Sequence, residues 1–85
     1  MGPSQILTID LETTGVNFGV DEIIQIAIFN GSGSRVFSSY INPKAKSWPA
    51  AEKINHISKE MVKDSPTIKE VRKDLRRIFN HAKVL

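Results

Sequence analysis

Two carboxylates, Asp10 and Glu12, stand two residues apart in the stretch ILTIDLETTGV, residues 6–16. The stretch reads as a β-strand, in which side chains two apart point to the same face with Cα atoms about 6.5–7 Å apart. Mg²⁺ and Mn²⁺ prefer carboxylate and water oxygens. In two-metal sites one ion activates water and the other stabilises the leaving oxygen of a phosphoryl group. Taken alone, such a pair more often marks a solvated strand face; what favours a metal site for phosphoryl hydrolysis is the context, a strand followed by D-x-E-T-T-G, a loop and an Ile-rich strand.

The turn that follows, Thr13-Thr14-Gly15, suits a substrate beside such a site. Hydroxyls and backbone N–H groups bind oxygens, and glycine lets a substrate approach the backbone closely. The charge distribution is uneven: residues 1–43 hold one Arg and four acids, a net −3, and residues 44–85 hold eleven Lys or Arg and five acids, a net +6. The acidic half suits a divalent cation, and the basic half suits a polyanionic partner. From charge alone, a solvated helical surface explains the basic half equally well.

The acids must be positioned by strands near the start of the chain. Three strands are predicted, over residues 5–12, 22–30 and 35–42. The first places Leu7, Ile9 and Leu11 on one face, opposite Asp10 and Glu12. The second is apolar on nearly both faces and is therefore expected in the centre of the sheet. The segment NGSGS, residues 30–34, predicts a hairpin turn, so the three strands form an antiparallel meander.

Helices follow a proline-flanked loop over residues 43–49. Two short helical turns are predicted within residues 50–64, broken near Ile57, with Ser58 as the N-cap of the second. A longer helix is predicted over residues 67–82, because Thr67 and Glu70 form a T-x-x-E capping box. Its expected buried stripe is Ile68, Val71, Leu75, Ile78, Phe79 and Ala82. Residues 83–85 read as the beginning of a fourth strand.

The composition excludes several classes of protein. The 85 residues allow one small domain at most, and 40% hydrophobic with 25% charged residues is ordinary for a soluble globular chain. No apolar run approaches the roughly 20 residues of a membrane span, and no signal peptide is recognisable. The absence of cysteine excludes disulfides and thiolate metal ligands and fits a cytoplasmic location.

The strand, the segment TIDLETTG and the elements after it together resemble one family. TIDLETTG is similar to the first motif of the DEDD (DnaQ-like) 3′–5′ exonucleases, which include proofreading subunits and domains such as those of DNA polymerase III. The resemblance continues through DEIIQIAIF, YINP, AEKINHISKEMVKDSP and IKEVRKDLRRIF. It implies a ribonuclease-H-like α/β fold, with a mixed sheet that begins with the antiparallel meander and is followed by helices.

The resemblance also implies roles for individual residues. Asp10 would coordinate two ions, Mg²⁺ or Mn²⁺, and Glu12 would ligate one of them and help to position the attacking water. The residues expected near the 3′-terminal nucleotide are Thr13, Thr14, Gly15, Asn55, His56 and Ile57. The implied substrate is a single-stranded or frayed 3′ end of DNA, with RNA as an alternative, and a DNA polymerase subunit is an implied partner. No membrane partner is expected.

The chain departs from the family pattern at several places. Gln25 stands where members often have Glu, and Asn55-His56 stand where they often have His-Gly. The family's second and third acidic motifs and its general base are expected beyond residue 85, so residues 1–85 read as the N-terminal part of one exonuclease domain, truncated after the first long helix and inactive alone. His81 in FNHAK lacks the Phe-Asp of the second motif and is expected to be structural, at a helix end.

Other readings stay open. The chain is alternatively a self-associating, non-catalytic fragment with an unpaired sheet edge, or a nucleic-acid-binding module without hydrolysis. Trp48 is expected to pack against the sheet edge, with base stacking as the lesser alternative. The basic residues of the last helix read as a solvated face in preference to a phosphate-binding stripe; they are Arg72, Lys73, Arg76 and Arg77.

Overall fold

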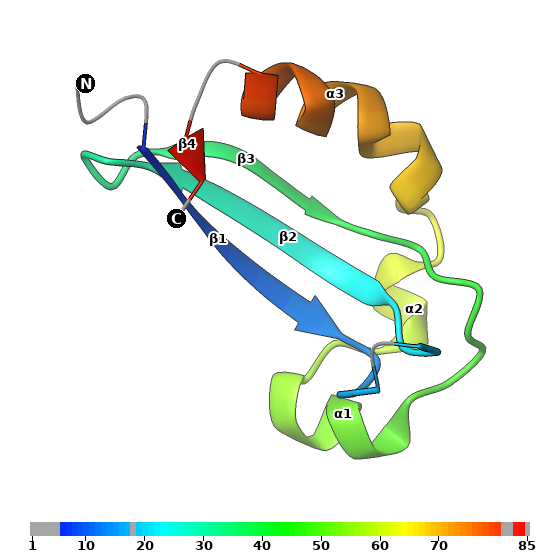
Figure 1. The fold of residues 1–85 in the computed structure, drawn as a ribbon. Coiled ribbons are helices and arrows are strands. Elements are labelled where there is room, and N and C mark those ends of the chain that lie inside the picture. The colour runs from blue at the N-terminus through cyan, green and yellow to red at the C-terminus, as the bar shows by residue number, and fades with distance from the viewer. Residues whose placement is uncertain (1–5, 18, 81–82, 85) are drawn as a thin grey trace.

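A computed structural model describes residues 6–17, 19–80 and 83–84 of the chain. Its elements are, in order, β1 (Ile6–Thr13), β2 (Ile23–Asn30), β3 (Arg35–Tyr40), α1 (Pro49–Asn55), α2 (Lys59–Val62), α3 (Ile68–Asn80) and β4 (Lys83–Val84). They form a four-stranded sheet in the order β3-β2-β1-β4 with helices packed along it (Figure 1). Within the described residues, no helix is long and apolar enough to cross a membrane.

The meander has the predicted antiparallel pairing, and β2 is central to it. β1 pairs with β2 so that Asp10 faces Ala27 and Glu12 faces Gln25, and the register shifts after Glu12. The hairpin closes where predicted, with Gly33 N donating to Asn30 O at 2.9 Å and Gly33 at φ 85°, a conformation that glycine adopts without steric cost. The short β4 pairs with β1 in parallel, which makes the sheet mixed.

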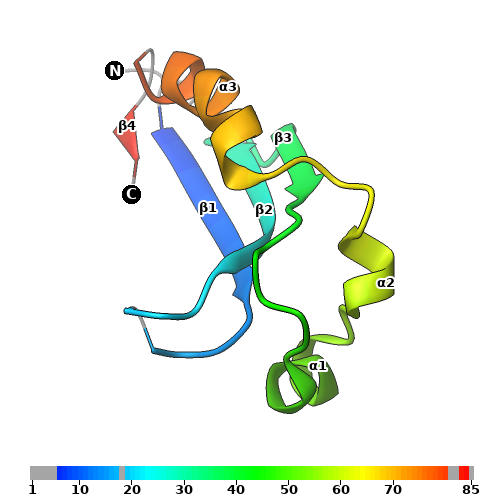
Figure 2. The same ribbon diagram turned by 90° about the vertical axis from the view of Figure 1, so that its right-hand side faces the viewer.

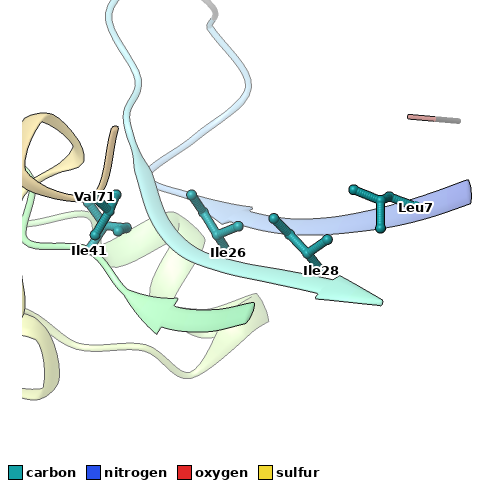
Figure 3. Close-up of a cluster of buried hydrophobic side chains, with 5 residues drawn as sticks. All are labelled: Leu7, Ile26, Ile28, Ile41 and Val71. Atoms are coloured by element: carbon teal, nitrogen blue, oxygen red, sulfur yellow. The ribbon is translucent and has the colours of Figure 1, made fainter. Parts of the chain in front are cut away.

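The face of the sheet opposite the acids is covered by α3. Leu7, Ile26 and Ile28 are buried there, and Val71 of α3 packs with them (Figure 3). Leu75, Ile78 and Phe79 of the predicted stripe pack partly against this cluster. The inclusion of Ile68 in the stripe is wrong: it is 42% exposed, because it lies in the first turn of the helix beside solvent.

A second core lies at the end of the sheet where β1 finishes and β2 begins. It contains Ile24, Trp48, Ile57 and Val62, all buried. Figure 2 shows α1 and α2 at this end and α3 at the other. Trp48 Nε1 donates to Ile57 O at 2.7 Å, so the polar atom of the indole is satisfied inside the core. Packing of Trp48 is confirmed, and its burial excludes the base-stacking alternative.

Most element ends fall within two residues of the predicted ones. Strand β3 ends at Tyr40, before the predicted 42, although Ile41 N still donates to Ile24 O at 2.9 Å. Helix α1 begins at Pro49, one residue before the predicted segment, because proline suits the first helical position. Helix α3 ends at Asn80, and the predicted positions of His81 and Ala82 lie outside the described residues.

The helix caps form as the sequence predicts. Ser58 Oγ accepts a hydrogen bond from Met61 N at 3.2 Å at the start of α2. At the start of α3, Thr67 N donates to Glu70 Oε1 at 2.9 Å and Glu70 N donates to Thr67 Oγ1 at 3.3 Å. These bonds satisfy backbone N–H groups that have no partner within the helix.

Candidate functional site

Asp10 and Glu12 share one side of the sheet, which we call the acid face. Both line a hollow of about 470 Å³ that also includes Gln25 and Ala27, their cross-strand neighbours on β2. Asp10 is exposed and Glu12 is half-buried. The alternation of β1 thus sends the two carboxylates away from the core that Leu7 helps to build, as the sequence predicts.

The two carboxylates have no cationic neighbour in the described part of the chain. The ion pairs found there, Lys63 with Glu60 and Arg77 with Asp74, lie in the helical half of the chain. No hydrogen bond among the described residues uses the carboxylate of Asp10 or Glu12, and no third His, Cys, Asp or Glu joins them in a cluster. Two like charges with free oxygens fit a hard divalent cation such as Mg²⁺ or Mn²⁺, with water or other groups completing its coordination.

A cleft of about 360 Å³ adjoins Glu12. One wall, residues 13–16, continues from β1, and the other, residues 50–55, belongs to α1. Asn55 joins the walls, because its Nδ2 donates to Thr13 O at 3.2 Å. Of the residues predicted near a terminal nucleotide, the cleft brings together Thr13, Thr14, Gly15 and Asn55.

The other two predicted substrate residues do not line this cleft. His56 is exposed and ends α1 with φ 60°, the left-handed conformation that glycine adopts most easily. It therefore takes the conformation expected of the glycine that family members often carry at this position. Ile57 is 4% exposed and packs in the second core, so its burial excludes a side-chain contact with a bound nucleotide.

The cleft has apolar side chains that the sequence reading did not single out. Val16 is 93% exposed on one wall and Ile54 is 83% exposed on the other, with Leu11 at 47% below them. Exposure of three aliphatic side chains around one cleft is typical of a surface that receives a flat apolar group. Periodicity does not reveal them, because Val16 lies in a loop and Ile54 in a two-turn helix.

Asp21 and Glu22 complete the acidic half of the chain, but both carboxylates accept hydrogen bonds within the protein. Asp21 accepts from Thr14 Oγ1 at 2.9 Å and from Asn17 N at 2.8 Å. Glu22 accepts from the backbone N–H groups of Lys44 and Ala45, each at 2.8 Å. These two acids hold loops, and the free carboxylates of the acidic half are those of the acid face.

The basic run of α3 shows no phosphate-binding geometry. Arg77 pairs with Asp74 at 2.7 Å, and Lys73 and Arg76 are exposed. Arg72 lines a separate hollow of about 610 Å³, where the carboxylates of Asp21 and Glu22 offset the nearby cationic groups. The reading as a solvated helix face agrees with this arrangement.

A mixed sheet in the order β3-β2-β1-β4, with helices on the face opposite an acid pair on β1, is a ribonuclease-H-like α/β fold. The chain belongs to the RNase T family of exonucleases, whose family model matches residues 7–85. This result confirms the predicted family and fold.

Individual relatives agree with the family assignment. The chain is 33% identical over 70 residues to a PolC-type DNA polymerase III of Caldanaerobacter subterraneus subsp. tengcongensis; the match covers 79% of this chain and 5% of the polymerase. The crystal structure of cell-death related nuclease 4 has the same fold, with a TM-score of 0.67 and 20% identity over 92% of this chain and 31% of that one. The chain thus spans a small part of both proteins.

Proposed function

We propose that this chain is part of a 3′–5′ exonuclease domain and supplies the first two acids of a two-metal site, Asp10 and Glu12. The observation that carries the proposal is the position of the acid pair: it is unpaired on an open sheet face and adjoins a cleft of nucleotide size. Family membership supports a nuclease-type function. Two oxygen ligands from one strand would hold Mg²⁺ or Mn²⁺ against a nucleic-acid phosphate.

In the proposed reaction, water adds across the terminal phosphodiester. The bond between phosphorus and the 3′-oxygen breaks, a nucleoside 5′-monophosphate leaves, and the shortened strand keeps a 3′-hydroxyl that takes up the proton. When bound, the divalent ions supply charge that activates water and stabilises the leaving oxygen. Within this chain, Asp10 and Glu12 hold the ions, while residues 13–16 and Asn55 orient the terminal nucleotide in the cleft.

The proposed substrate is a single-stranded or frayed 3′ end of DNA. The cleft presents aliphatic groups to a base, Val16 and Ile54, and few polar side chains that would read the base edge. Such a surface accepts any base, which suits sequence-independent removal of terminal nucleotides. The similarity to a PolC-type polymerase supports a further proposal that this domain works with a DNA polymerase in proofreading.

The decisive experiment measures release of nucleoside 5′-monophosphate from a 3′-labelled single strand by the whole protein that contains these residues. We expect Mn²⁺-dependent release that is lost in Asp10→Ala and Glu12→Ala and retained in Asp74→Ala, a matched acid on α3. Activity that survives Asp10→Ala would refute the assignment. A ribonucleotide strand run in parallel separates RNA from DNA as the preferred substrate.

We also propose that residues 1–85 alone bind Mn²⁺ weakly and do not turn over, because the described residues bring only two carboxylates together. Clear turnover by the isolated chain, lost in Glu12→Ala, would contradict this. A binding module without hydrolysis would show no Asp10-dependent Mn²⁺ affinity. Sedimentation of the chain at high concentration tests self-association, for which a stable monomer is the opposing result.

A further inference from the structure

The loop between β1 and β2 is closed at its base by bonds between Thr14 and Glu22. Thr14 N donates to Glu22 O at 2.9 Å, and Glu22 N donates to Thr14 Oγ1 at 2.9 Å. Two further bonds lie inside the loop, where Val20 N and Asp21 N donate to Asn17 O at 3.1 and 2.7 Å. Hydrogen bonds therefore link the two sides of the loop. The first residues of the loop also form one wall of the cleft beside Glu12.

Asp21 occupies the centre of this loop. Its Oδ1 accepts from Thr14 Oγ1 at 2.9 Å and its Oδ2 accepts from Asn17 N at 2.8 Å. Its carboxylate also lies directly against Gly15, since a Cβ on Gly15 would be 2.7 Å from Asp21 Cγ. A side chain at position 15 would have to displace the Asp21 carboxylate, a reason for glycine that differs from the substrate approach expected from the sequence.

We propose that Asp21 is a positioning residue for the terminal-nucleotide cleft. It does not line the cleft, but through Thr14 and Gly15 it fixes the wall formed by residues 13–16. The opposite wall is attached to the same segment by the bond from Asn55 to Thr13 O. Asp21 therefore sets the separation of the walls, and the identification of the ligand as a nucleotide rests on the proposed function.

The carboxylate is the chemical group that this position requires. Thr14 Oγ1 already accepts a bond from Glu22 N, so its own proton is donated to Asp21. Asn17 N is a second donor, and a carboxylate accepts from both donors at once. In Asp21→Asn the amide nitrogen is a donor, so either the Thr14 hydroxyl or the Asn17 N–H loses its acceptor.

The test uses the 85-residue chain and two NMR readouts. The first is amide hydrogen exchange at Asn17, whose N–H donates to Asp21 Oδ2, and for which we expect acceleration of about tenfold or more in Asp21→Asn, as follows from losing a bond to a charged acceptor. The second is a titration with thymidine 5′-monophosphate in saturating Mg²⁺, for which we expect affinity about tenfold weaker. Line broadening by Mn²⁺ at Asp10 should be unchanged, because the metal ligands lie on β1.

Four variants separate positioning from general loss of stability. Thr14→Val removes the hydroxyl that donates to Asp21 and should weaken nucleotide affinity as Asp21→Asn does, whereas Thr14→Ser keeps the hydroxyl and should keep the affinity of the wild type. Combining Thr14→Val with Asp21→Asn should weaken nucleotide affinity by less than the sum of the two single changes, because each single change already disrupts the bond between Thr14 and Asp21. Glu70→Gln weakens the cap of α3, a helix that does not line the cleft, and should leave nucleotide affinity unchanged.

The outcomes distinguish this inference from the proposed function. Unchanged exchange at Asn17 in Asp21→Asn would overturn the positioning role, whether or not nucleotide binds. Accelerated exchange with unchanged nucleotide affinity would also overturn the positioning role, since the loop would then not control the shape of the cleft that binds the nucleotide. If the wild-type chain bound neither Mn²⁺ nor nucleotide, the weak binding proposed for residues 1–85 would be refuted, and the positioning role, which is stated for that ligand, would be overturned with it even if exchange accelerated; the exonuclease function would still be decided by the activity of the whole protein.

Discussion

Repulsion between the carboxylates of Asp10 and Glu12 on β1 should lower the stability of the metal-free fold, and a bound divalent ion should remove that cost. Asp10 and Glu12 lie one pleat apart, about 7 Å between Cα atoms, and no cation of the described chain offsets them. At that separation the repulsion is about 0.6 kcal/mol in water and about 2.4 kcal/mol at an effective dielectric constant of 20. Because Asp10 is exposed, the lower value applies. Asp10→Asn should therefore raise the free energy of unfolding by roughly 0.6 kcal/mol without metal, and the midpoint temperature of unfolding by about 2–5 °C.

Mn²⁺ should reverse this order. At a concentration of about ten times its dissociation constant, an ion that binds only the folded state adds about 1.4 kcal/mol. The wild-type chain should gain this amount, whereas Asp10→Asn keeps one carboxylate and should gain little. Wild type would then be the more stable protein by about 0.8 kcal/mol, the difference between these two effects.

The assay is thermal unfolding followed by circular dichroism at low salt, with and without Mn²⁺. Asp74→Asn provides the control, because Asp74 carries a similar charge but pairs with Arg77 on α3. It should show no stabilisation without metal and the full gain of the wild type with it. An Asp10→Asn variant that is less stable than wild type without metal, or one that gains as much from Mn²⁺, would refute the reasoning.

Three further changes test other parts of the structure. Trp48→Phe should lower the free energy of unfolding by about 1–3 kcal/mol in chemical denaturation, because Ile57 O loses its buried donor; an unchanged value would contradict this bond. The pKa of Glu70 lies below its ordinary value because Thr67 N, and then the Thr67 hydroxyl, donate to its carboxylate. The stability that Glu70 adds relative to Glu70→Gln should therefore be complete above the ordinary glutamate pKa and disappear as the pH falls through the lowered one, and a constant difference across that range would contradict the cap. Ile54→Ser should weaken thymidine monophosphate binding with a change in stability below about 0.5 kcal/mol, since the side chain is 83% exposed; equal affinity would remove Ile54 from the site.

Local rules predicted the acid face and the caps from the sequence. The alternation of β1 depends only on strand geometry, so Asp10 and Glu12 had to share a face once residues 6–13 formed a strand. The capping boxes join residues three apart, and the NGSGS turn is equally local. These features involve neighbours in the chain, for which residue type and spacing are sufficient.

The second core could not be predicted in the same way. Ile57 was expected beside the nucleotide because its segment resembles the corresponding segment of the family, but the structure buries it with Trp48 and Ile24. A short segment between two helical turns has no periodicity that shows which side chain points inward. Its direction is set by the indole that bonds to Ile57 O, a contact that only the folded chain makes.

The sequence by itself determined that two carboxylates leave one side of a strand and that a turn with hydroxyls follows them. Only the tertiary structure decided that Asp21 and Glu22 hold loops, and that Asn55 closes the cleft by bonding to Thr13 across 42 positions of the chain. The physical reason is that residue type fixes which bonds a group is able to make, whereas the packing of distant segments fixes which of its partners come within reach.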